Sequence, residues 1–166
     1  ILMQEIQKAK LGQYKKIYKG FKYITENEYD LTKMTPEQLE HLKLSSKFTQ
    51  ELNFKNKTFL CKVVDVYDGD TVKVVFYFHD VLYRWNVRLY GINTPEMRPS
   101  KLNPLRKSIK ANAIKSRDFL KTLFQTTNNL VYIECGDFDK YGRLLGTFFY
   151  KDSISFFDES INYAMI

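Results

Sequence analysis

The chain has 166 residues, of which 44% are hydrophobic and 16% aromatic, so it can form one folded domain with a short additional segment, and wholesale disorder is excluded. Its 26 basic and 19 acidic residues give a formal net charge of +7, which favours polyanionic partners such as nucleic acid or an anionic membrane surface. No apolar run approaches the roughly 18 residues that a membrane span needs, so none is expected.

Residues 1–57 are expected to form a basic, partly helical N-terminal extension. Residues 6–23 interleave Lys with Tyr and Phe, a pattern typical of a segment that follows a nucleic-acid backbone, or of a solvated basic helix. The run Thr35-Pro36-Glu37-Gln38 predicts a helix start, with Thr as the N-cap and Gln closing a capping box. Residues 53–57 look like a linker to the next domain.

From residue 58 to residue 166 the pattern predicts one domain that is mainly β with some α structure. The strands are expected at residues 58–66, 71–78, 82–90, 130–135 and 144–150, because hydrophobic residues alternate or run continuously there. A helix is expected at 104–126, and a last helix capped by Asp158. Five short strands with a helix after the third predict a closed β-barrel of the OB type.

Two cysteines, Cys61 and Cys135, lie on expected strands. They form no C-x-x-C pair, so nothing supports a zinc site. We expect two buried thiols, and a disulfide between them stays open.

Three polar segments fall on turns or strand ends. Asp68-Gly69-Asp70 is expected to form a tight hairpin in which Gly accepts a positive φ, and its carboxylates suit either a Ca²⁺ site or simple turn chemistry. Residues 91–96 follow a strand whose polar face carries Arg88. Residues 139–143 form a turn in which Gly142 makes the bend. Each segment, taken alone, is most simply an ordinary turn.

Together these segments resemble the staphylococcal-nuclease-like (thermonuclease) family. The matching runs are VYDGDTV at 66–72, VRLYGINTPE at 87–96 and DKYGRLL at 139–145. The resemblance extends from about residue 58 to the end. It implies a five-stranded OB barrel and Ca²⁺-dependent hydrolysis of DNA and RNA that leaves 3′-phosphate ends. Because the family continues beyond the point that corresponds to Ile166, we expect the C-terminal end to be incomplete.

The resemblance also implies catalytic roles for three residues. Arg88 and Arg143 would clamp the phosphate and stabilise the charge of the transition state. Glu96 would act as the general base on the attacking water. Phosphodiester hydrolysis requires such charge neutralisation and an oriented water, so the residue types agree with the implied reaction.

The implied metal ligands are the Asp70 carboxylate, the Thr94 carbonyl and Asn93, which stands where the family has a second Asp. Asp68 would lie next to these ligands without contacting the ion. Because Ca²⁺ affinity depends on ligand charge, Asn93 is expected to weaken metal binding and activity.

Lys140 and Tyr141 would lie near the terminal phosphate of a bound nucleotide. DNA or RNA, or both, would be the partner of the domain, and we expect a monomer. The alternative is a non-catalytic OB-fold module that binds nucleic acid or a protein partner, which Asn93 and the basic N-terminal extension favour.

Overall fold

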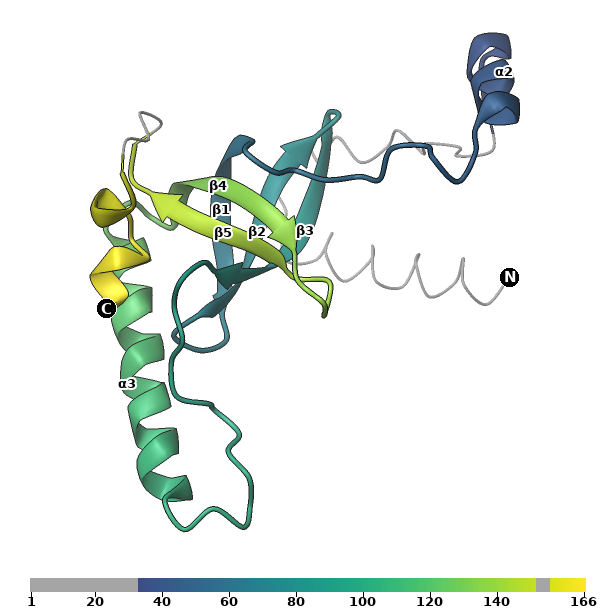
Figure 1. The fold of residues 1–166 in the computed structure, drawn as a ribbon. Helices are drawn as coiled ribbons and strands as arrows, with labels where there is room; N and C mark the ends of the chain where they lie inside the picture. The colour runs from purple at the N-terminus through teal and green to yellow at the C-terminus, as the bar shows by residue number, and fades with distance from the viewer. Residues whose placement is uncertain (1–32, 152–155) are drawn as a thin grey trace, which may run out of the picture. The chain divides into compact units, whose positions relative to one another are not determined.

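A computed structural model of the chain describes residues 33–151 and 156–166 (Figure 1). The chain divides into two compact units, Ile1–Gln50 and Glu51–Ile166. The Lys- and aromatic-rich stretch at residues 6–23 lies outside the described residues. None of the helices in the part that the structure describes is long and apolar enough to cross a membrane.

The first unit contains the helix α2 (Pro36–Leu44), which begins as its sequence predicts. The Thr35 hydroxyl accepts a hydrogen bond from the Gln38 backbone N–H at 3.1 Å, and the Gln38 side chain accepts one from the Thr35 N–H at 2.8 Å. These two bonds satisfy donors that a helix start otherwise leaves unpaired. The predicted capping box is therefore confirmed.

The second unit is a closed barrel of five strands: β1 (Thr58–Val66), β2 (Thr71–Phe78), β3 (Val81–Leu89), β4 (Leu130–Phe138) and β5 (Leu144–Phe149). Its strand order is β1-β2-β3-β5-β4, and β1 pairs with β4 to close it. All neighbours are antiparallel except β3 and β5, which pair in parallel. This confirms the predicted OB-type α+β fold.

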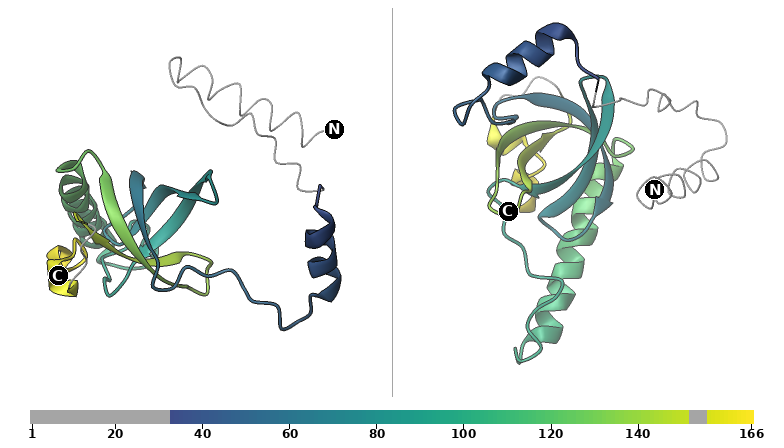
Figure 2. Two further views of the ribbon diagram at one scale, coloured as in Figure 1. Left: turned by 90° about the horizontal axis from the view of Figure 1, so that it is seen from above. Right: turned by 90° about the vertical axis from the view of Figure 1, so that its right-hand side faces the viewer.

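The inward side chains of the strands form the core, as the alternation on β2 predicts: Val72, Val74 and Phe76 are buried. Helix α3 (Arg106–Gln125) packs Ala113, Leu120 and Phe124 into the same unit. The helix begins two residues after the predicted start at residue 104. The views in Figure 2 show α3 and the C-terminal segment on the same side of the barrel.

Residues 53–57 are not a linker. Phe54 is fully buried, and its ring makes edge contacts with Phe59, Phe78 and Trp85 at centroid distances of 5.0–5.6 Å. Two backbone hydrogen bonds join residues 56 and 57 to Cys135 on β4. The barrel unit accordingly starts at Glu51, before the expected boundary at residue 58.

The predicted C-terminal helix is replaced by two short 3-10 helices, η1 (Phe157–Glu159) and η2 (Tyr163–Met165). The interruption has a physical cause between them. The Ile161 N–H donates to the Phe148 carbonyl at 2.8 Å, and the buried Asn162 side chain also bonds to β5. A continuous helix would break these bonds to the barrel.

Candidate functional site

The loop between β1 and β2 holds the first predicted site residues. The prediction of a positive φ at Gly69 is wrong, because among the described glycines only Gly91 and Gly142 have one. Gly69 is needed for space instead. A Cβ there would lie 2.7 Å from Ser116 Cβ on α3 and 2.7 Å from Thr94 Cγ2. The loop is therefore in close contact with both the helix and the segment that follows β3.

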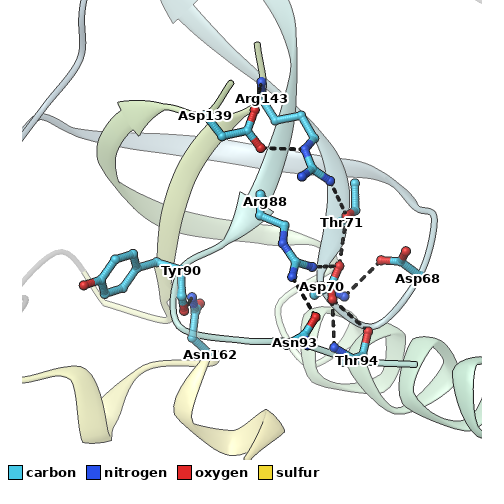
Figure 3. Close-up of polar contacts among 10 residues, drawn as sticks. All are labelled: Asp68, Asp70, Thr71, Arg88, Tyr90, Asn93, Thr94, Asp139, Arg143 and Asn162. Atoms are coloured by element: carbon cyan, nitrogen blue, oxygen red, sulfur yellow. Dashed lines mark hydrogen bonds and ion pairs between the residues drawn. The ribbon is translucent and has the colours of Figure 1, made fainter. Parts of the chain in front are cut away.

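Asp70 is the centre of the polar cluster in Figure 3 and is only 4% exposed. Its Oδ2 accepts hydrogen bonds from the Thr94 N–H at 2.8 Å and the Thr94 hydroxyl at 3.0 Å. Its Oδ1 accepts one from the Thr71 hydroxyl at 3.0 Å and forms an ion pair with Arg88. Four donors thus surround one buried carboxylate, which is the arrangement that stabilises its charged form.

Arg88 joins the two sides of the site. It lies on β3 opposite Thr71 of β2, and its side chain is 20% exposed. One guanidinium nitrogen pairs with Asp70, and the other donates to Asn93 Oδ1 at 3.2 Å. The oxygens of Asp70 and Asn93 therefore face the same positive group. The predicted ligand residues Asp70, Asn93 and Thr94 are brought together.

Asp68 lies next to these residues and accepts a hydrogen bond from the backbone of Asp70. Its Oδ1 accepts a hydrogen bond from the Asp70 N–H at 3.1 Å. Burial raises the pKa of Asp68, although hydrogen bonds from Thr71 and the charges of Arg88 and Arg143 oppose the rise.

Arg143 reaches the same place from the turn before β5. Gly142 lies at the predicted bend and has φ +76°. The Asp139 carboxylate accepts hydrogen bonds from the backbone N–H of Tyr141 and Arg143, both at 2.9 Å, and from Arg143 Nε at 2.8 Å. The guanidinium held in this way donates to the Thr71 hydroxyl at 3.4 Å. Arg88 of β3 and Arg143 of the turn before β5 thus contact two adjacent residues, Asp70 and Thr71.

The electrostatics reflect this convergence. Burial lowers the pKa of Arg88, and the nearby positive charge of Arg143 lowers it further. For Asp139, burial alone would raise the pKa, but the hydrogen bonds from Arg143 and Tyr141 outweigh it and lower the pKa. The two guanidiniums therefore lie close enough to repel each other, and the Asp68 and Asp139 carboxylates offset part of this repulsion at Arg88.

The side chains of the other predicted residues make no hydrogen bond with Asp70, Arg88 or Asn93 in the described part of the chain. Glu96 is exposed and makes no hydrogen bond or ion pair within residues 33–151 and 156–166. Tyr141 is 71% exposed, with Lys140 Nζ 5.0 Å and the Arg143 guanidinium carbon 5.5 Å from its ring centre. Among the described residues, no group of three or more His, Cys, Asp or Glu side chains is placed to hold a metal.

Three residues that shape the site received no role from the sequence. Thr71 connects Asp70 to Arg143, and Asp139 orients Arg143. Asn162 is fully buried and donates to the carbonyls of Tyr90 at 3.0 Å and Gly146 at 2.9 Å, which ties the end of β3 to β5. Its only sequence signal is a polar residue among apolar ones near the end of the chain.

Comparison with known proteins agrees with this geometry. The model of the staphylococcal nuclease homologue family matches residues 86–166. The matched range includes Arg88, Asn93, Glu96 and Arg143. Asp70 precedes this range and contacts Arg88 within it. A domain of this kind indicates a function related to nucleic acid. No curated protein matches the chain.

Proposed function

Because this chain is a member of the staphylococcal nuclease-like family, we propose that it is a Ca²⁺-dependent nuclease that hydrolyses phosphodiester bonds of DNA, RNA or both. It acts with little sequence specificity and leaves 3′-phosphate ends. One observation carries the proposal: Arg88 and Arg143 contact the adjacent residues Asp70 and Thr71. Two fixed guanidiniums at one point suit a phosphate group, which accepts paired hydrogen bonds from Arg.

The two arginines would stabilise charge as it develops on the phosphate oxygens. Arg143 is held by Asp139, so little reorganisation accompanies binding. Arg88 is only 20% exposed, which strengthens its attraction for an anion relative to a surface side chain. Tyr141 beside Arg143 would contact the nucleotide, with Lys140 adding positive charge near its terminal phosphate.

The donor set suits Ca²⁺ in chemical kind. Asp70 offers a carboxylate, Asn93 an amide oxygen and Thr94 a backbone carbonyl, and Ca²⁺ binds oxygen ligands of these types. The oxygens of Asp70 and Asn93 already face one cationic group, the Arg88 guanidinium. When bound, Ca²⁺ would supply positive charge next to the phosphate and polarise the attacking water. With one carboxylate among these ligands, we expect weak binding.

Glu96 would accept the proton of the attacking water. Its carboxylate is exposed and makes no hydrogen bond or ion pair with the other described residues. It lies two residues beyond Thr94, whose backbone N–H is fixed on Asp70. A carboxylate near the phosphate can serve as a general base if it comes within hydrogen-bond reach of the water.

A cleavage assay tests the proposal. Labelled single-stranded DNA and RNA are incubated with the protein in Ca²⁺ or in a chelator, and the product ends are analysed for 3′-phosphate. Glu96→Gln is expected to reduce cleavage at least about 100-fold, while the exposed control Glu51→Gln leaves it unchanged. Equal cleavage in chelator, or by Glu96→Gln, would contradict the proposed mechanism.

The alternative is a non-catalytic OB-fold module that binds nucleic acid or a protein partner. One observation favours it: both oxygens of Asp70 are already engaged by four donors, and the neighbouring Asn93 is neutral. Binding of nucleic acid that weakens with salt, without any cleavage in Ca²⁺, would support this alternative over the nuclease.

A further inference from the structure

The segment directly after Glu96 is strongly basic, and its net charge equals that of the whole chain. Residues 97–117, here called the basic arm, contain seven basic residues and no Asp or Glu, against a formal net charge of +7 for all 166 residues. The arm comprises the loop after the candidate site and the first twelve residues of α3. Its basic residues are Arg98, Lys101, Arg106, Lys107, Lys110, Lys115 and Arg117.

Most of these charges have no ion-pair partner in the part of the chain that the structure describes. Arg117 pairs with Asp118 at 2.9 Å. The other six side chains are exposed, and none makes an ion pair with a carboxylate among residues 33–151 and 156–166. Like charges on neighbouring helix turns repel each other, so the arm is electrostatically unfavourable without an external anion.

The residues at the start of α3 add to this unfavourable electrostatic energy. The residue before the helix, Leu105, provides no side-chain cap, and the first turn contains no acidic residue. Instead Arg106 and Lys107 lie at the end of the helix where its dipole is positive, and where acidic side chains are normally favoured. The local sequence thus works against helix stability, which is characteristic of positions kept for binding.

The arm leads away from the candidate site. Ser116 lies beside Gly69 in the Asp70 loop, so this part of α3 is at the site. From Ser116 toward its N-terminus the helix extends beyond the barrel (Figure 1), and between residues 106 and 112 every residue except Ile109 is exposed. Ten residues of helix span about 15 Å. At the phosphate spacing of one B-form strand, this corresponds to about four phosphates.

We infer that the basic arm binds the sugar-phosphate backbone of a nucleic acid on one side of the phosphate held by Arg88 and Arg143. The inference rests on the proposed function, since it extends the same substrate beyond the cleavage point. An anionic membrane is the rival partner, because Leu102 and Leu105 are 94% and 64% exposed in the arm. Nucleic acid is favoured because the charge follows the helix from the site outward.

The test is a binding measurement that does not depend on cleavage. The full chain with Arg106→Gln, Lys107→Gln and Lys110→Gln is compared with wild type and with a control that removes three exposed charges elsewhere, Lys62→Gln, Arg84→Gln and Lys151→Gln. Affinity for fluorescent single-stranded DNA of 24 and of 4 nucleotides is measured in EDTA at several salt concentrations. Thermal unfolding verifies that each variant folds.

For the 24-nucleotide probe, losing three phosphate contacts is expected to reduce the salt slope by about 2, since each contact on a single strand contributes about 0.7. At 0.1 M salt the same relation gives a weakening of up to about 100-fold. The 4-nucleotide probe and the control variant are expected to change little. An equal loss in the control, or none in the arm variant, would overturn the inference.

The outcomes separate this inference from the proposed function. Binding that depends on the arm, without any Ca²⁺-dependent cleavage, would support the inference about the arm and contradict the proposed nuclease activity. Ca²⁺-dependent cleavage together with binding that does not depend on the arm would support the nuclease and overturn the inference about the arm. Vesicles containing about 30% phosphatidylserine test the membrane: flotation that is lost in the arm variant, with DNA binding unchanged, would overturn the inference in favour of a lipid surface.

Discussion

Replacing Asp70 by Asn is expected to destabilise the barrel by about 3 kcal/mol. The carboxylate is surrounded by donors: the Thr94 N–H and hydroxyl, the Thr71 hydroxyl and Arg88. An amide nitrogen at the Oδ2 position would face the Thr94 N–H, which cannot accept. At the Oδ1 position it would face the guanidinium of Arg88. Either orientation leaves one donor without its acceptor.

The magnitude follows from burial and from the partners that remain. Removing one member of a buried ion pair costs about 3–5 kcal/mol because the other charge stays unpaired. Here the lower end applies, since Arg88 is 20% exposed and keeps its bond to Asn93. An exposed pair offers a matched control: Asp65, whose side chain is 49% exposed, contacts Lys73 at 3.0 Å. Asp65→Asn is expected to cost less than about 1 kcal/mol.

Urea unfolding monitored by the fluorescence of Trp85 measures the difference in the barrel, because the chain has a single Trp and it lies on β3. With a slope of about 1–3 kcal/mol per molar urea, the Asp70→Asn midpoint should fall by about 1–3 M. A loss equal to that of Asp65→Asn would refute the reasoning, because it would mean that the four donors do not depend on a buried charge.

Four further changes probe other contacts. Gly69→Ala is expected to lower the free energy of unfolding by about 1–3 kcal/mol and to reduce the binding of a phosphate analogue, because the new Cβ would lie 2.7 Å from atoms of Ser116 and Thr94. Scanning calorimetry measures the first effect and titration calorimetry the second. Phe54→Ala should cost about 3–5 kcal/mol in urea unfolding if this ring belongs to the core. Asn162→Ala should cost about 2–4 kcal/mol, since it removes the side-chain acceptor of the buried Phe148 N–H and the side-chain donor to the Tyr90 and Gly146 carbonyls; near-neutral unfolding would argue against that bond network. Asp139→Asn should destabilise at pH 7, with the difference from wild type disappearing as unfolding is measured below about pH 4. The reason is that a carboxyl whose pKa is lowered from 3.8 stabilises above that value and loses the effect as pH falls through the lowered pKa.

Local signals in the sequence were sufficient wherever a structure is decided by neighbouring residues. The capping box at Thr35 and Gln38, the bend at Gly142 and the alternation along β2 depend on residues within a few positions of one another. The order of strands and helix then restricted the topology to an OB-type barrel, because short connections limit how five strands can close. The motifs around Arg88 and Arg143 indicated the family.

Only the tertiary structure decided which of these residues contact one another and what role residues such as Gly69 have. The role of Gly69 depends on Ser116, which is 47 positions away, and the bonds of Asp70 depend on Thr94, 24 positions away. Phe54 and Asn162 appeared to belong to a linker and a helix, but the barrel takes one into its core and pairs the other with β5. Contacts between distant residues form only when the chain closes, because their energy comes from burial and exclusion of water, which no local pattern records.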